Sequence, residues 1–151
     1  MAEQGSVSVS KRISANDLGL TGSHQAGIAV PKGAESGILS FFPALDKSLK
    51  NPSCPVTVRG ADSGVYWELR FVYYNGKRHG TSTRDEYRLS GMTKMMRDMA
   101  VEPGDDLVFT RTAAGEVLVS VSKAAPITFA DVHSEPVIVT RGGWTILEED
   151  A

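Results

Sequence analysis

The sequence predicts a mainly β domain, a barrel or a sandwich, built from about seven short strands and one convincing helix. Apolar residues alternate with polar ones over several short runs, which is typical of half-buried strands. Clusters of Gly, Pro, Asn and Asp separate these runs and predict turns. Only residues 92–99 repeat their apolar side chains with the period of a helix.

The chain has 151 residues, of which 41% are hydrophobic and 23% charged, as in an ordinary soluble domain. We expect a flexible segment over 1–12, one domain over 13–147 and an acidic tail over 148–151. The single cysteine excludes an internal disulfide and a four-cysteine zinc site. There is no apolar run long enough for a signal peptide or a membrane span, so we expect a cytoplasmic protein without a membrane partner.

Residues 13–27 are rich in Gly, Ser, Asn and Asp, and they predict a long structured loop. Long loops in compact domains are usually functional. Val7 and Val9 alternate ahead of the loop and can open a strand. The segments after the loop predict a short strand over 28–31, a helical turn over 39–46 that buries Phe41 or Phe42, and a strand around Val56 and Val58.

The clearest strand of the chain spans residues 65–74. Every second residue from Val65 to Tyr73 is apolar, so one face of this strand is expected to enter the core. Asn75-Gly76 follows at once and is the strongest short signal of a hairpin turn. The chain is therefore expected to turn directly into residues 77–88.

The C-terminal half predicts one helix and further strands. Methionines recur at the spacing of one helix face, which favours core packing: Met92, Met95, Met96 and Met99. The remaining alternating runs predict turns over 102–106 and 113–115 and strands over 107–109, 117–121, 137–139 and 144–146.

Positive charge is concentrated in one part of the sequence. Between Arg70 and Arg97, seven basic residues stand against two acidic ones, a local charge of +5 in a chain of net charge −2. A basic surface on an acidic body steers a polyanion to one face and repels it elsewhere.

The centre of this basic stretch has a pattern suited to base reading. If residues 84–88 are extended, Arg84, Glu86 and Arg88 project from one face. Arginine offers a planar fork to the two acceptors of guanine, and a carboxylate accepts from the amino group of cytosine. The same pattern also fits a solvent-exposed edge strand with an internal ion pair.

Most candidate catalytic and metal-binding motifs lack the residue types or the spacing that their chemistry requires. Asp62 and Glu68 imitate the carboxylates of one nuclease class, but Arg70 stands where a lysine is typical. The three histidines lie far apart without a metal-binding pattern, and no phosphate-binding glycine loop or Gly-x-Ser-x-Gly motif is present. We therefore expect no catalytic residue, metal site or cofactor in this chain.

In the polar loop, His24 and Gln25 can both donate and accept hydrogen bonds, as base readers must. Hydrogen bonding within the loop is an equally good interpretation of these two residues.

Several motifs occur together in a characteristic order and spacing. They are Ile13-Ser-Ala-Asn-Asp17, Thr21-Gly-Ser-His-Gln25 with Gly27, Val30-Pro31, Phe42-Pro43, Asn51-Pro52, Val72-Tyr-Tyr-Asn75, Thr83-Arg-Asp-Glu-Tyr-Arg-Leu-Ser90 and Pro103-Gly-Asp-Asp-Leu-Val-Phe-Thr-Arg111. In this arrangement, from about Ile13 to Arg111, the chain resembles the N-terminal effector domain of EcoRII-type restriction endonucleases. That domain is a pseudobarrel related to plant transcription-factor DNA-binding domains.

The resemblance implies a seven-stranded DNA-binding pseudobarrel with one or two short helices. Two arms of such a domain enter the major groove and read CC(A/T)GG. The implied base-reading residues are His24 and Gln25 in the first arm, and Arg84, Asp85, Glu86, Tyr87 and Arg88 in the second. The expected phosphate-binding residues are Lys77, Arg78, His79, Ser82, Lys94 and Arg97. The chain departs from the family at Tyr87, where a lysine can stand, and at Ala29, where a bulky residue can stand.

The function expected from these observations is sequence-specific binding of double-stranded DNA by the effector or targeting domain of a type II restriction endonuclease. Its catalytic nuclease domain would be fused in the full-length protein, and Mg²⁺ would be needed only there. The alternatives are a small metal-dependent nuclease using Asp62 and Glu68, and a pseudobarrel that binds a small ligand or a protein.

Overall fold

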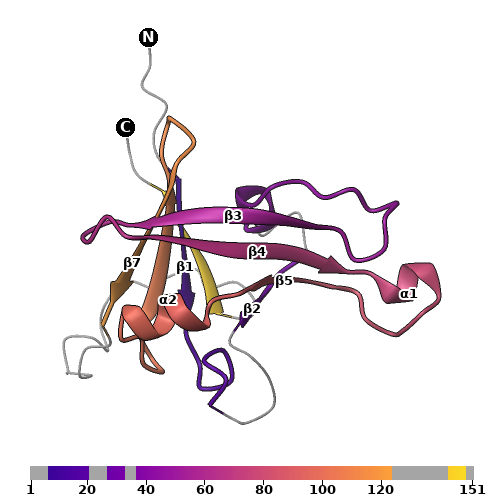
Figure 1. The fold of residues 1–151 in the computed structure, drawn as a ribbon, viewed down its shortest axis with the longest axis horizontal. Helices are drawn as coiled ribbons and strands as arrows, with labels where there is room; N and C mark the ends of the chain where they lie inside the picture. Colours follow the sequence, from indigo (N-terminus) through magenta and orange to yellow (C-terminus); the bar gives the residue numbers. More distant parts are fainter. Residues whose placement is uncertain (1–6, 21–26, 33–36, 124–142, 149–151) are drawn as a thin grey trace.

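The computed structural model describes residues 7–20, 27–32, 37–123 and 143–148. These residues form one eight-stranded sheet that curls into a half-barrel, with short helices at its ends (Figure 1). The predicted mainly β pseudobarrel is therefore confirmed. The elements in chain order are β1 (Val7–Arg12), β2 (Gly27–Val30), the 3-10 helix η2 (Leu39–Phe41), β3 (Ser53–Gly60), β4 (Tyr66–Tyr74), α1 (Gly76–His79), β5 (Glu86–Ser90), α2 (Thr93–Asp98), β6 (Asp106–Arg111), β7 (Val117–Ser122) and β8 (Trp144–Glu148).

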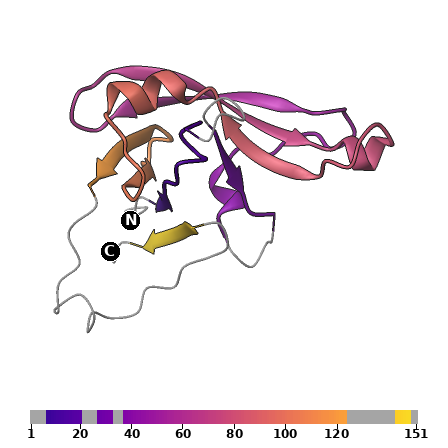
Figure 2. The same cartoon turned by 90° about the horizontal axis from the view of Figure 1, so that it is seen from below.

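The strands lie in the order β2-β5-β4-β3-β7-β6-β1-β8, with β3 and β7 parallel and the other neighbouring pairs antiparallel. The two edge strands are thus β2 and β8. Trp144 on β8 is fully buried, and its Nε1 donates a hydrogen bond of 2.8 Å to the carbonyl oxygen of Ala29 on β2. This bond joins β8 to β2. Figure 2 shows how the strands curl around the interior.

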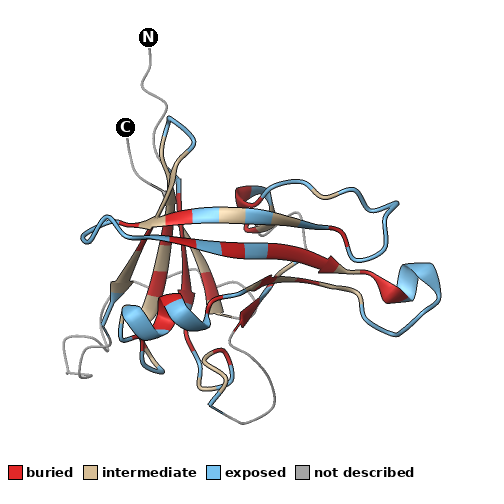
Figure 3. Ribbon diagram, viewed as in Figure 1, coloured by how far each residue is buried: buried red, intermediate tan, exposed pale blue. Residues whose placement is uncertain are grey.

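The core is built on the alternating face of β4. Trp67, Leu69, Phe71 and Tyr73 are buried, as the sequence predicts, and the alternation is visible along the strand in Figure 3. Aromatic rings continue the packing across the neighbouring elements. Their centroids are separated by 4.9 Å for Phe42 and Phe71, 5.5 Å for Phe71 and Tyr87, and 4.3 Å for Tyr87 and Tyr73.

The methionine stripe also lies in the core, as predicted. Met92 and Met95 have no exposed surface, Met96 is buried, and Met99 packs against the same cluster. Flexible thioether side chains can fill the irregular space between a short helix and a curved sheet. They attach α2 to the end of the barrel.

The structured domain begins earlier than the expected boundary at residue 13. β1 pairs with both β6 and β8, and Val9 is buried between them. The alternation of Val7 and Val9 therefore marks a strand inside the sheet rather than a flexible segment. The strand expected over 137–139 lies outside the described residues.

The tight hairpin turn expected at Asn75-Gly76 is wrong. β4 and β5 do pair antiparallel, with Tyr74 opposite Glu86, but α1 and a following loop connect them. Asn75 has a φ of −116°, whereas the predicted turn needs a positive φ at this residue.

Tertiary hydrogen bonds of Asn75 explain this difference. Its buried amide accepts from the backbone N–H of Asn51 at 2.7 Å and donates to the carbonyl of Leu49 at 2.8 Å. The side chain of Asn51 in turn accepts from the backbone N–H of Asn75 at 3.1 Å. These bonds outweigh the local turn preference and fix the root of α1.

The bond between the edge strands predicts a stability effect. Trp144→Phe keeps an aromatic ring in the core, but it removes the indole donor to the carbonyl of Ala29 and leaves space in a fully buried site. We expect the free energy of unfolding in urea to fall by about 1–3 kcal/mol, because one tertiary hydrogen bond and part of a buried aromatic side chain are lost. Trp67→Phe is the matched control, because it removes an indole donor to Asp98 at 3.0 Å from a residue that is 9% exposed and does not join the two edges of the sheet. If Trp144→Phe lost no more unfolding free energy than Trp67→Phe, the contact between β8 and β2 would not be important for stability.

Candidate nucleic-acid interface

The alternation of β5 places three charged residues on its outer face. Tyr87 and Leu89 are buried on the inner face, so Glu86 and Arg88 project outward. Arg84, just before the strand, reaches the same face, where its Nε and Nη2 lie 3.1 and 2.9 Å from one oxygen of Glu86. The other oxygen of Glu86 accepts from Nη1 of Arg88 at 3.5 Å. We call Arg84, Glu86 and Arg88 the outer row.

The sequence left two interpretations open for these residues, a base-reading face and an internal ion pair, and the outer row has the geometry of both. The three side chains share one face, and Glu86 forms an ion pair with each arginine. The pairs are only partly buried, so their net stabilisation is small and a stronger ligand can replace them. The Arg84 guanidinium also lies 3.8 Å above the ring centroid of Tyr74, which orients its plane.

Two of the predicted base readers do not belong to the outer row. Tyr87 is only 5% exposed and stacks on Tyr73, so it faces the core rather than the outer row, and its role as a base reader stays a prediction. The carboxylate of Asp85 accepts hydrogen bonds from the Tyr73 hydroxyl at 2.6 Å and from Lys32 at 2.8 Å. Asp85 thus connects the inner aromatic stack to Lys32, which follows β2.

These contacts shift the pKa values of both partners. The hydrogen bonds from Lys32 and Tyr73 lower the pKa of Asp85. The hydrogen bond to Asp85, together with burial, raises the pKa of Tyr73 to about 12. Tyr73 therefore remains a neutral donor under physiological conditions.

The predicted phosphate-binding residues separate into two groups. Lys77, Arg78 and His79 form the exposed last turn of α1, and none of them takes part in an ion pair found among the described residues. Ser82, in the loop after α1, accepts from the backbone N–H of Arg84 at 3.2 Å. This hydroxyl supports the chain where the outer row begins.

The second group lies on α2. Lys94 forms an ion pair of 2.9 Å with Asp98, and Arg97 is exposed on the same helix. Figure 1 shows α1 and α2 at opposite ends of β4 and β5. The structure therefore does not bring Lys94 and Arg97 together with the basic residues of α1.

The first arm, residues 13–27, joins the outer row at its C-terminal end. The backbone N–H of Gly27 donates to the carbonyl of Asp17 at 3.0 Å, which closes the base of the loop. The carbonyl of Gly27 accepts from Nη2 of Arg88 at 3.3 Å. His24 and Gln25 lie outside the described residues.

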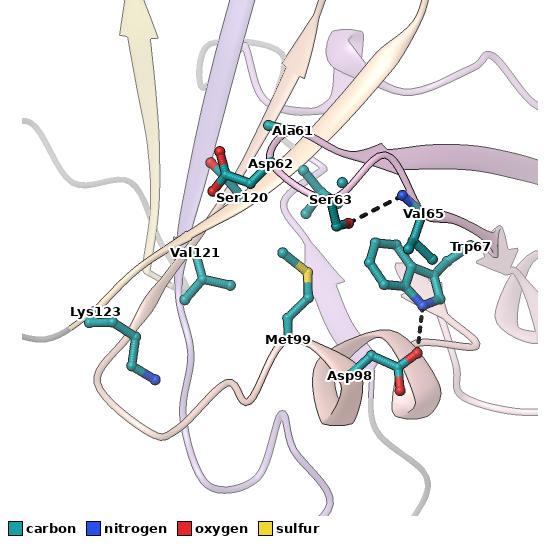
Figure 4. A pocket seen from close by; sticks show the side chains of 12 residues that line it. Ala61, Asp62, Ser63, Val65, Trp67, Asp98, Met99, Ser120, Val121 and Lys123 are labelled. Atoms are coloured by element: carbon teal, nitrogen blue, oxygen red, sulfur yellow. Dashed lines mark hydrogen bonds between the residues drawn. The ribbon is translucent and has the colours of Figure 1, made fainter.

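The carboxylates of the alternative nuclease site lie on different parts of the barrel. Asp62, in the β3–β4 turn, borders a cleft of about 590 Å³ with Trp67, Asp98 and Lys123 (Figure 4). Glu68 is exposed on the outer face of β4. Within the described ranges, no three His, Cys, Asp or Glu side chains are grouped to hold a metal ion. No helix in these ranges is long and apolar enough to cross a membrane.

Comparison with protein families identifies the group to which this barrel belongs. The family described as "Restriction endonuclease EcoRII, N-terminal" matches residues 2–119. The chain belongs to this family. It is 38% identical over 82 residues to the type II restriction enzyme EcoRII of Escherichia coli. The match covers 53% of this chain but only 19% of the Escherichia coli enzyme.

Solved structures share the fold of this EcoRII N-terminal family member at low sequence identity. The Arabidopsis FUS3–DNA complex has a TM-score of 0.57 and 17% identity, covering 77% of this chain and 96% of the other. The N-terminal domain of Helicobacter pylori LlaJI.R1 has a TM-score of 0.55 and 15% identity, with coverages of 95% and 99%. The UbaLAI restriction endonuclease B3 domain, solved with cognate DNA, has a TM-score of 0.57 and 19% identity, with coverages of 95% and 87%.

The raised pKa of Tyr73 makes the stability of this family member depend on alkaline pH. In the unfolded chain the phenol ionises near its ordinary pKa of about 10, whereas in the fold its pKa is about 12. The stabilisation is therefore complete below pH 10 and is lost as the pH rises through 12. We expect the unfolding free energy in urea to fall over this window and Tyr73→Phe to remove part of the fall. If the unfolding free energy of Tyr73→Phe fell with pH as steeply as that of the wild type, Tyr73 would not be the group responsible.

Proposed function

We propose that this chain binds double-stranded DNA sequence-specifically, with the outer row of β5 reading G·C base pairs in the major groove. The observation that carries this proposal is the row itself: two arginine forks and one carboxylate on a single face of a strand whose opposite face is fixed in the core. Family membership and the fold shared with DNA-bound B3 domains support it.

The chemistry of the outer row matches the edges of G·C pairs. An arginine fork donates to O6 and N7 of guanine, and a carboxylate accepts from N4 of cytosine. In the free protein Glu86 satisfies both arginines, so their polar groups are oriented before DNA arrives. We propose CC(A/T)GG as the target, because four G·C pairs suit this row. A central A·T pair read without an orientation-specific contact explains the degeneracy.

The exposed turn of α1 supplies the sequence-independent part of binding. Lys77, Arg78 and His79 lie at the far end of the loop that leads into the outer row. Basic side chains that neutralise phosphates increase affinity and salt dependence, and they position the protein on the duplex.

We further propose that the domain targets a restriction endonuclease whose nuclease domain lies elsewhere in a longer protein. This chain spans about one fifth of the Escherichia coli enzyme that it matches. Catalysis, and the Mg²⁺ that it requires, would then belong to the remaining part. The same domain can either tether that nuclease to its target or activate it.

A gel-shift titration tests the proposal directly. The chain is titrated against a short CC(A/T)GG duplex and a scrambled duplex at near-physiological salt without Mg²⁺. A preference of about a thousandfold or more is expected, because specific binding lies in this range. Equal and strongly salt-dependent affinities for the two duplexes would indicate that the outer row binds phosphates and does not read bases. Absence of binding would favour a ligand-binding barrel.

The variant Arg84→Ala distinguishes base reading from sequence-independent electrostatic attraction to DNA. The variant removes one fork from the outer row while leaving β5 and its buried side chains in place. We expect its affinity for the cognate duplex to fall by about 1–3 kcal/mol, with little change on the scrambled duplex. An equal loss on both duplexes would show that Arg84 contacts only phosphate.

Lys77→Ala tests the phosphate-binding role of α1. We expect a similar loss of affinity on both duplexes and a slope of log K against log salt reduced by about one phosphate contact. Lys94→Ala, measured in parallel, shows whether α2 also contacts the duplex. An unchanged slope in Lys77→Ala would remove α1 from the interface.

A further inference from the structure

The root of the first arm contains a buried ion pair that the sequence analysis did not detect. Lys11 lies on β1, two residues after the buried Val9, so period-two alternation points both side chains toward the interior. Its Nζ lies 2.8 Å from a carboxylate oxygen of Asp17, and only 8% and 12% of the two side chains are exposed. Nζ also donates to the carbonyl of Arg12 at 2.8 Å.

Asp17 uses both its side chain and its backbone to fix the loop. The oxygen that meets Lys11 also accepts from the backbone N–H of Ser14 at 3.0 Å. The backbone N–H of Asp17 donates to the Ser14 hydroxyl at 3.1 Å, and its carbonyl accepts from Gly27 at 3.0 Å. The beginning and the end of the first arm are therefore joined at one residue.

Gly27 continues the connection to the outer row. Its carbonyl accepts from Arg88 at 3.3 Å, and Arg88 contacts Glu86. A Cβ at Gly27 would lie 3.1 Å from the carbonyl oxygen of Leu89, so the close approach of β2 to β5 favours glycine. A continuous set of polar contacts thus runs from β1 through the base of the first arm to the outer row.

Stability alone does not explain a buried ion pair at this place. Desolvation of two charges offsets much of their attraction, and apolar side chains of similar volume often stabilise a fold as well or better. Base reading, in contrast, requires side chains held within about 0.5 Å of their productive geometry. A contact that fixes Gly27 beside Arg88 meets this requirement.

We propose that Lys11 and Asp17 are positioning residues for DNA recognition, which hold Gly27, and through it Arg88 of the outer row, without contacting DNA. This inference rests on the proposed function and adds to it the residues that position Arg88 of the outer row from β1.

The test uses the pair variant Lys11→Met/Asp17→Asn, which removes both charges and keeps side chains of similar length. The control is Arg59→Met/Glu116→Gln, an ion pair whose side chains are 33% and 39% exposed. That ion pair has contacts of 2.6 and 2.9 Å and joins the far end of β3 to the start of β7, away from the first arm and α1. Cooperative urea unfolding and circular dichroism establish that each variant is folded.

The measured quantity is the ratio of dissociation constants for scrambled and CC(A/T)GG duplexes, together with the salt slope. We expect the ratio of the pair variant to fall by about tenfold or more, as for one lost bidentate base contact. The salt slope should stay unchanged, because α1 keeps its charges. The control should keep the wild-type ratio and slope. The free energy of unfolding in urea, measured for both variants, separates a change in positioning from a loss of general stability.

Ser14→Ala provides a milder variant. It removes one exposed hydroxyl that binds Asp17, and we expect the ratio to fall by about fivefold, as for one hydrogen bond. If the pair variant does not fold, an unchanged ratio in Ser14→Ala overturns the inference. A folded pair variant with the wild-type ratio also overturns it, as does an equal loss in the control. A wild-type protein without any preference would overturn the proposed function itself, which is a separate result.

Discussion

The alternation of β5 is the constraint on which the candidate interface depends. Tyr87 and Leu89 enter the aromatic and aliphatic core, and this burial fixes which face of the strand can meet solvent. Because side chains alternate strictly, Glu86 and Arg88 must then point outward together. Slipping the strand by one residue would bury two charges and expose two core side chains. The hydrophobic core thus determines the orientation of the outer row.

Contacts remote from the outer row determine where each arm begins. The reciprocal hydrogen bonds of Asn51 and Asn75 fix the root of α1, while Asp17 and Gly27 close the base of the first arm. Trp144 joins the last strand to β2, the strand into which the first arm leads. The root of each arm is therefore held by buried polar groups.

Local periodicity explains why much of the fold can be predicted from the sequence. The alternating strand β4, the methionine face of α2 and the shared face of Arg84, Glu86 and Arg88 all follow from repeats within a few residues. Features set by distant partners could not be predicted in this way. Asn75 has a strong turn signal, but its amide binds residues about 24 positions away. Pairing of Lys11 with Asp17 leaves no periodic signal, and the separation of α1 from α2 depends on the path of the whole sheet.

Methylation interference is the measurement that tests the central claim most directly, namely that the outer row reads guanine in the major groove. A CC(A/T)GG duplex methylated sparsely at guanine N7 is bound by the protein, and the bound and free fractions are cleaved and compared. Because N7 lies in the major groove and accepts from an arginine fork, guanines of the target should be depleted from the bound fraction, and this depletion should weaken in Arg84→Ala. Equal methylation of the target guanines in both fractions would contradict major-groove reading by Arg84, Glu86 and Arg88.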